Sequence, residues 1–213
     1  MNFKKILLII LIFLISFSVV IYVYCEIQLN LVANKNISGC FSKDELNIVD
    51  HRFNRALWIH YTDDQEMKLE KITLLKVLFK AISKKGIDPS SDTIVYLSAG
   101  RLIHENNATE FKGIHWQIRW LSFSKWISSN WDVDECLSYL ANKSYYGHGY
   151  KGISQAAKGF FQKKPNELSV DEISMLVAAT IEPTTYNIKT PDAKLMKKTN
   201  QIKAKLLRSK NCM

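Results

Sequence analysis

The sequence predicts a mainly α-helical domain behind a single N-terminal transmembrane helix. One apolar run near the N-terminus has about the length that a helix needs to cross a bilayer. In several later segments the apolar residues recur at spacings of three and four, which is the period of one face of an α-helix. Three segments also carry the capping pattern that begins helices. No strand pattern or internal repeat is visible in the sequence.

The apolar run covers residues 6–25 and is interrupted only by two serines. About 20 such residues, coiled as a helix, cross roughly 30 Å of hydrocarbon. Two lysines precede the run, so the positive-inside tendency predicts a cytoplasmic tip over residues 1–5 and the rest of the chain outside. A cleaved signal peptide is the alternative. Its apolar core is usually shorter, about 7–15 residues, and Tyr24 and Cys25 make a poor cleavage site, so we predict an uncleaved anchor.

The length of 213 residues suits one domain plus an appendage. We predict a stalk over residues 26–50 and a folded domain over residues 51–213. The formal net charge of +9 favours contact with anionic lipid head groups or a polyanionic substrate. Nucleic acid is not an expected partner, because an exported domain rarely meets it and no basic run is interleaved with aromatic residues.

The cysteines outside the apolar run match no zinc or haem spacing. They are Cys40, Cys136 and Cys212. In an oxidising compartment two of them can pair, and we favour Cys40 with Cys212, which would leave Cys136 buried.

In the first half of the predicted domain the helical signals are short. Residues 42–45 carry a capping pair that marks a helix start. The apolar residues of segment 69–82 recur on one helical face, and turn-forming residues follow it. Residues 93–103 form a second apolar segment. Helix and strand both remain open for this segment, because a glycine interrupts it.

The second half of the chain carries the strongest helical signals. Residues 114–127 are aromatic and periodic, as in a buried helix. Asp132 and Glu135 form a capping pair for a helix that ends near residue 142, and Ser169 and Glu172 form another for a helix over residues 170–180. The remaining elements are a glycine-rich loop over residues 146–150, a helix over residues 153–161 and a basic helix over residues 192–207.

Residues 135–205 contain a series of short motifs without a gap between them. In order they are a helix from Glu135 to Asn142, Tyr146-Gly147 with Gly149 and Gly152, Ala156-Ala157 with Phe160-Phe161 and Lys163, Leu168-Ser169 with Glu172, Pro183 with Tyr186-Asn187, and Lys197-Lys198. This series resembles the C-terminal lobe of the peptidoglycan glycosyltransferase (transglycosylase) domain, glycosyltransferase family 51. The resemblance implies a lysozyme-like helical fold and a lipid-linked peptidoglycan precursor or glycan as ligand. It also implies a place in the bacterial cytoplasmic membrane, with the domain on the periplasmic side.

The resemblance implies chemistry that needs two glutamates, one in an E-D-x-x-F-x-x-H-x-G motif and one in R-K-x-x-E. Glycosyl transfer requires a base for the attacking hydroxyl and cations for the departing diphosphate. Counting back along the sequence from Asn142 places Trp120 at the position of the second glutamate. A tryptophan cannot replace a carboxylate there, because its indole offers one N–H donor and no acceptor. Near the expected first motif, the closest carboxylates are Asp63, Asp64 and Glu66, off the family spacing. They are the candidate catalytic residues.

The resemblance also implies a set of substrate-binding residues. Thr93 matches a threonine of the family's G-S-T-I-T-Q-Q-L-x-K-N segment. Arg101 is only an approximate replacement for the lysine of that segment. Arg119 lies in the R-K-x-x-E window, and Lys197 and Lys198 match the family's basic pair. No metal site or cofactor is predicted, although a divalent cation can accompany a diphosphate.

Three functions remain open at this point. A divergent enzyme would polymerise lipid-linked disaccharide–peptide units with displaced carboxylates. A non-catalytic relative would bind glycan, precursor or a cell-wall synthase. A lysozyme-like hydrolase would need an acid such as Glu105 or Glu110. The tryptophan at residue 120 favours the second function and predicts weak or no catalysis.

Overall fold

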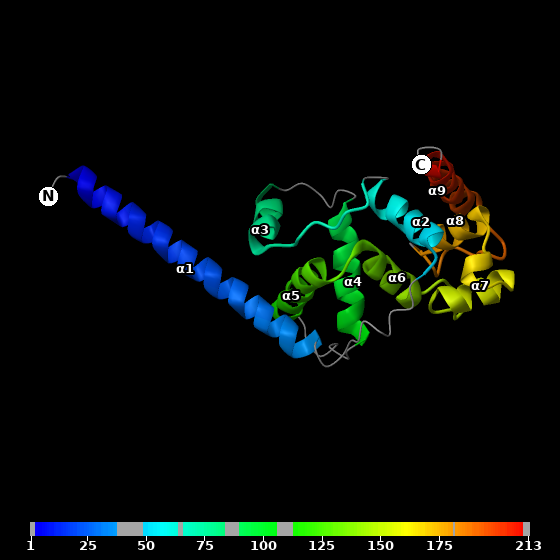
Figure 1. The fold of residues 1–213 in the computed structure, drawn as a ribbon, viewed down its shortest axis with the longest axis horizontal. Coiled ribbons are helices and arrows are strands. Elements are labelled where there is room, and N and C mark those ends of the chain that lie inside the picture. Colours follow the sequence, from blue (N-terminus) through cyan, green and yellow to red (C-terminus); the bar gives the residue numbers. More distant parts are fainter. Residues whose placement is uncertain are drawn as a thin grey trace.

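The computed structural model describes residues 3–37, 49–63, 66–83, 90–105, 113–180 and 182–210, and these residues confirm the mainly α fold (Figure 1). Within these ranges the one β interaction is an isolated bridge between Tyr145 and Lys151. The helices are α1 (Phe3–Ile37), α2 (His51–Thr62), α3 (Leu74–Ser83), α4 (Ser91–Glu105), α5 (Ile114–Asn130), α6 (Val133–Lys143), α7 (Ile153–Phe161), the 3₁₀ helix η3 (Pro165–Glu167), α8 (Val170–Ala179) and α9 (Ala193–Lys210).

Helix α1 projects from the rest of the molecule as one long rod (Figure 1). Its segment Phe3–Lys35 has the length and composition to cross a membrane. The helix continues past the predicted end of the apolar run at Cys25. In this continuation Leu29, Ala33 and Ile37 are buried, and α1 packs on α5. The first part of the predicted stalk is therefore a helical extension of the anchor. The division into stalk and domain stays a prediction.

Helix α2 lies at the centre of the domain, in contact with α4, α6, α8 and α9. Phe53, Ala56, Leu57 and Trp58 are at most 1 % exposed. Fully burying a side chain of this kind contributes about 1.5–3 kcal/mol. The core therefore surrounds α2, while α1, α3 and α5 lie to one side of it (Figure 1).

The capping boxes predicted at Asp132 and at Ser169 are present. Asp132 Oδ1 accepts a hydrogen bond from the Glu135 backbone N–H at 2.8 Å, and Glu135 Oε2 accepts one from the Asp132 N–H at 2.8 Å. The same exchange joins Ser169 and Glu172 at 2.7 and 3.3 Å. These contacts satisfy N–H groups that have no partner within the helix, and they set where α6 and α8 begin.

The structure differs from the prediction for segment 69–82, where the predicted helix start is wrong. Helix α3 begins only at Leu74, and residues 66–73 are not helical. The reason is a competing contact, because the Ile72 N–H donates to Ser128 Oγ of α5 at 2.9 Å. Segment 93–103, for which helix and strand were both open, is the helix α4.

Two earlier expectations fall wholly or partly on residues that the structure does not describe. The helix start at residues 42–45 lies outside the described ranges, and so do Cys40 and Cys212. Cys136 is buried and forms no disulfide with another described residue.

The glycine loop explains why two of the family motifs occur together. Gly147 has φ +88°, and a Cβ at this position would lie 2.6 Å from the Pro183 carbonyl oxygen. Next to it, His148 Nε2 lies 2.9 Å from Asn187 Oδ1. The loop and the Pro-x-x-Tyr-Asn segment therefore form one packed unit, so these motif residues have a structural role.

Candidate functional site

The position expected to hold the second glutamate is occupied by an aromatic cluster between α4 and α5. The Trp120 indole Nε1–H donates to the Tyr96 carbonyl oxygen at 3.1 Å. The ring centroids of Trp120 and Tyr96 are 4.4 Å apart, and Trp116 stacks on Trp120 at 6.2 Å. Gly100 of α4 faces the indole, and a Cβ there would lie 4.0 Å from Nε1, an ordinary contact distance. No carboxylate takes part in these contacts.

The cluster has no group suited to removing a proton from a sugar hydroxyl. The single Trp120 donor is already paired with a backbone carbonyl, and an indole has no acceptor. Burial, and after it the charge of Asp92, raises the pKa of the Tyr96 phenol above its usual value of 10.0. The phenol is therefore protonated near neutral pH and is not a general base there.

Of the three candidate catalytic carboxylates, Asp63 lies apart from Trp120. It caps the C-terminus of α2 with φ 58°, and its carboxylate pairs with Lys205 of α9. That hydrogen bond, followed by the charge of Lys205, lowers the pKa of Asp63. A strongly ionised, lysine-paired carboxylate is a poor base. Asp64 lies outside the described residues, and Glu66 is exposed in the non-helical segment.

Asp63 lines a groove of about 350 Å³ between α2 and α9. His60, Lys198, Lys205 and Arg208 also line it, and the described lining residues come only from these two helices and the α2 cap. His60 Nδ1 is buried without a hydrogen-bond partner in the described structure. Burial, and then the charge of Lys198, lowers the pKa of His60 to about 4. Sequence motifs do not single out this histidine, because it belongs to none of them.

The predicted substrate-binding residues do not form one surface. Arg119 lies on α5, in a groove of about 420 Å³ that α5 forms with α1. Lys197 and Lys198 lie on α9, which packs on α2 and α8 at the other end of the domain (Figure 1). Thr93 and Arg101 lie on α4, and each has a buried polar atom without a hydrogen-bond partner among the described residues.

The groove around Arg119 combines apolar walls with basic groups. Its apolar part comes from Leu31, Val32 and Ile118, and Lys35 and His115 stand beside Arg119. It lies along the part of α1 that follows the apolar run, so a ligand in it would sit close to the membrane.

Glu105, the hydrolase candidate, lines a third groove of about 450 Å³. Its carboxylate accepts a hydrogen bond from the Tyr139 hydroxyl at 3.0 Å and pairs with Lys143 at 3.0 Å and Lys151 at 3.7 Å. A general acid of the lysozyme type needs an apolar setting that keeps its proton. Glu105 instead lies among donors and cations, as a structural ion pair does. Glu110 lies outside the described residues.

Comparison with known proteins supports the same family that the sequence motifs indicate. A family model described as Transglycosylase matches residues 65–207, and the chain belongs to this family. It is 25% identical over 177 residues to the biosynthetic peptidoglycan transglycosylase of Haemophilus influenzae, covering 82% of this chain and 67% of that relative. It is also 36% identical over 61 residues to penicillin-binding protein 1A of Mycobacterium tuberculosis, covering 29% of this chain and 7% of that relative. The chain thus spans about two thirds of the length of the Haemophilus relative.

Proposed function

We propose that this protein binds lipid-linked peptidoglycan precursor or nascent glycan at the outer face of the cytoplasmic membrane, with weak or no glycosyl transfer. Membership of the transglycosylase family supports a role in peptidoglycan biogenesis. The apolar helix α1 supports a place in the membrane. The observation that carries the proposal is the aromatic cluster of Trp120, Tyr96 and Trp116 at the expected carboxylate position.

The expected loss of catalysis follows from general acid–base chemistry. A positioned base contributes about 10²–10⁴-fold to the rate of a proton transfer step. At residue 120 an indole with its only donor occupied replaces that base. Asp63 is paired with Lys205 in a groove whose described lining residues come from α2, its cap and α9, with none from α4 or α5, so we do not expect it to compensate for the loss.

Ligand binding is supported at the groove between α1 and α5. A lipid-linked diphosphate has an apolar tail and a polyanionic head. The groove offers apolar side chains together with Arg119, Lys35 and His115. Arg119 suits a diphosphate because its planar guanidinium can donate two parallel hydrogen bonds to phosphate oxygens.

The test uses the full chain in lipid nanodiscs with purified lipid-linked precursor. Gel analysis of glycan chains is expected to show no polymer under conditions in which an active transglycosylase forms long chains. Robust polymerisation that disappears in Asp63→Asn, Asp64→Asn or Glu66→Gln would show that the protein is a divergent enzyme.

Binding is measured in the same nanodiscs. The double variant Lys35→Ala/Arg119→Ala should weaken precursor binding, because it removes two cations from the groove. Lys197→Ala/Lys198→Ala removes the same charge from α9 and serves as the matched control. Binding should also weaken as salt is added, since exposed charges are screened. Equal affinity in both double variants and the unmodified chain would rule out this groove as the diphosphate site.

A further inference from the structure

The aromatic cluster around residue 120 is only partly covered by the described protein. Tyr96, Trp116 and Trp120 are each half-buried and pack against the edge of the core. The ring planes of Trp116 and Trp120 are 16° apart, so the two indoles are nearly parallel. A single half-exposed aromatic residue is ordinary, but adjoining rings from two helices form one continuous apolar surface. This surface suits a ligand that has an apolar face of its own.

Contacts within the protein fix the cluster in position. The Trp120 indole is held by its hydrogen bond to the Tyr96 carbonyl oxygen at 3.1 Å. Helix α5 is in turn joined to α1 and α3, because Glu26 pairs with Lys125 and accepts a hydrogen bond from the Leu74 N–H at 3.2 Å. Rings that are already ordered lose little conformational freedom when a ligand binds, so the cluster is prepared for binding.

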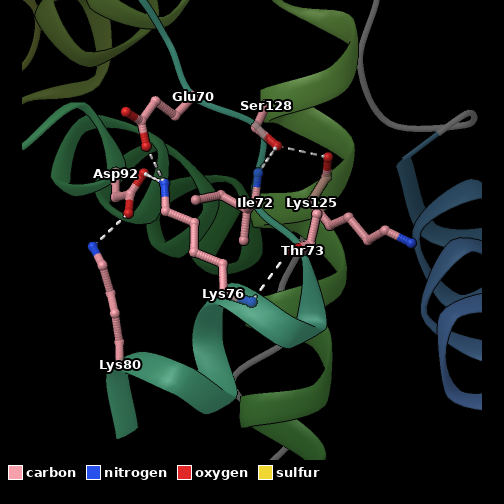
Figure 2. Close-up of polar contacts among 8 residues, drawn as sticks. All are labelled: Glu70, Ile72, Thr73, Lys76, Lys80, Asp92, Lys125 and Ser128. Atoms are coloured by element: carbon pink, nitrogen blue, oxygen red, sulfur yellow. Dashed lines mark hydrogen bonds and ion pairs between the residues drawn. The ribbon is translucent and has the colours of Figure 1, made fainter. Parts of the chain in front are cut away.

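Polar groups of α3 and α4 border the cluster. Lys76 and Lys80 reach the two carboxylate oxygens of Asp92 at 2.7 and 2.6 Å, as Figure 2 shows. Asp92 lies one helical turn before Tyr96, and the charges of Asp92 and Lys76 both act on the Tyr96 phenol. The phenol keeps its proton near neutral pH, so it can donate a hydrogen bond to a hydroxyl or amide oxygen of a ligand.

The cluster also borders the groove in which we place the diphosphate. That groove takes His115, Ile118 and Arg119 from α5, whereas the cluster takes Trp116 and Trp120. Each tryptophan directly follows a groove residue in the sequence, so its side chain is rotated by about 100° around α5 and displaced by about 1.5 Å along it. A ligand that extends from one face of α5 to the next would therefore contact both sites.

We propose that Trp116 and Trp120, together with Tyr96, form a sugar platform, on which a pyranose ring of the precursor stacks while its diphosphate lies at Arg119. The C–H groups on one face of a pyranose ring carry partial positive charge and meet the negative face of an aromatic ring. In a lipid-linked saccharide the first sugar is bonded directly to the diphosphate, so a sugar site has to adjoin the diphosphate site. The sugar platform rests on the proposed function, precursor binding, and adds to it the side chains that contact the saccharide.

A sugar suits this surface better than an acyl chain does. The border of the cluster carries the Tyr96 hydroxyl and the ammonium of Lys76, and hydrocarbon offers these groups no hydrogen bond. Hydroxyl and amide groups of a saccharide can accept from them. Aromatic side chains with a few polar groups at fixed positions are also the usual lining of small-ligand sites.

The test compares two probes in nanodiscs that hold the full chain. One probe is the purified lipid-linked disaccharide–peptide precursor, and the other is the same polyprenyl diphosphate without its sugars. The unmodified chain should bind the precursor more tightly. Trp116→Leu should weaken precursor binding about tenfold, as expected for lost aromatic stacking, and leave binding of the sugar-free probe nearly unchanged. Trp116→Phe keeps a ring and should retain most of the affinity.

Trp126→Leu is the matched control. Trp126 is also a half-buried tryptophan of α5, but its ring packs edge-on against Trp131, outside the cluster. This variant should leave the affinity for both probes unchanged. Lys35→Ala/Arg119→Ala should weaken binding of both probes, because it acts on the diphosphate that they share. Retained binding of the sugar-free probe also shows that Trp116→Leu is folded.

The two probes separate failure of the sugar platform from failure of the proposed function. Equal affinity of the unmodified chain for both probes would overturn the platform and leave precursor binding intact. The same holds if Trp116→Leu weakens both probes equally, or weakens precursor binding no more than Trp126→Leu does. Binding of neither probe by the unmodified chain would overturn the proposed function, and the platform with it.

Discussion

At the scale of single residues, Trp120 connects two helices, because its indole on α5 donates a hydrogen bond to the Tyr96 carbonyl oxygen on α4. Motif spacing alone placed a tryptophan at the position of an expected glutamate. The sequence did not show that the indole donates to the Tyr96 carbonyl or that Tyr96 and Trp116 stack on it, because those contacts join α4 and α5. The expected functional residues Arg119, Lys197 and Lys198 were likewise identified by motif, but their separation on α5 and α9 depends on tertiary packing.

The glycine loop gives a residue-scale prediction with an internal control. Gly147→Ala should lower the free energy of unfolding by about 2–4 kcal/mol, since φ is positive and the new Cβ would clash with backbone. The Cβ would lie 2.6 Å from the Pro183 carbonyl oxygen. Gly149→Ala has a similar φ of +82° but nothing within 4 Å, so it should cost only about 1 kcal/mol. Thermal unfolding in detergent measures both. Equal losses would mean that the Pro183 contact contributes nothing.

His60 gives a residue-scale prediction about pH. Its pKa falls from 6.5 to about 4 on folding, first because of burial and then because of Lys198. Above pH 6.5 the histidine is neutral in both states. As the pH falls toward 4, the unfolded chain binds the proton and the folded chain does not, so the free energy of unfolding decreases. The full effect is at most about 3 kcal/mol.

The His60 prediction is checked by unfolding measurements across the range between these two pKa values. His60→Gln should flatten the pH dependence there more than His51→Gln, which changes an exposed histidine on the same helix. Carboxylates with lowered pKa, such as Asp63, lose their contribution mainly below this window. Identical slopes in the two variants would contradict burial of a neutral His60.

At the scale of elements, helix starts set by local capping were predictable from the sequence. A helix start set by a hydrogen bond to a distant residue was not. The capping pairs at Asp132 and Ser169 act within four residues, so the sequence located α6 and α8 well. The start of α3 was misplaced because Ser128, 56 positions further along the chain, takes the Ile72 N–H. The sequence predicted one apolar helical face over residues 69–82, but only the tertiary structure shows that Leu75, Phe79 and Ile82 of α3 lie exposed and do not join the core.

Asp92 supplies the element-scale prediction. Asp92→Asn removes a carboxylate that is only 2% exposed and that both Lys76 and Lys80 contact, and should cost about 1–3 kcal/mol. Because the lysines belong to α3, amide hydrogen exchange of residues 74–83 should accelerate more than that of α6 or α8. Glu70→Gln removes a carboxylate that is 67% exposed and should have little effect. Uniform acceleration across all helices would argue against a local role in seating α3.

At the scale of the whole molecule, the long helix α1 ties the domain to the membrane through α5 and the start of α3. The sequence predicted a span of about the right length but not its continuation to Ile37. That continuation is stabilised by burial of Leu29, Ala33 and Ile37, which no local pattern reveals. The mainly α fold was predictable because most of the later helices carry their own periodicity or cap. The central helix α2, the choice of helix over strand for α4, and the placement of grooves between helices were not predictable in this way.

The last prediction concerns the orientation of the whole chain. Lys4 and Lys5 before the apolar run should keep the N-terminus in the cytoplasm and place the domain outside, because positive charges near a span resist export. A bacterial alkaline phosphatase fused after residue 210 should therefore be active, and a green fluorescent protein fused there by the same export route should be dark. Lys4→Glu/Lys5→Glu should lower phosphatase activity by misorienting part of the population, whereas Lys197→Glu/Lys198→Glu, far from the span, should not. A bright fluorescent fusion with an inactive phosphatase would place the grooves on the cytoplasmic side, where the outward-facing precursor could not reach them.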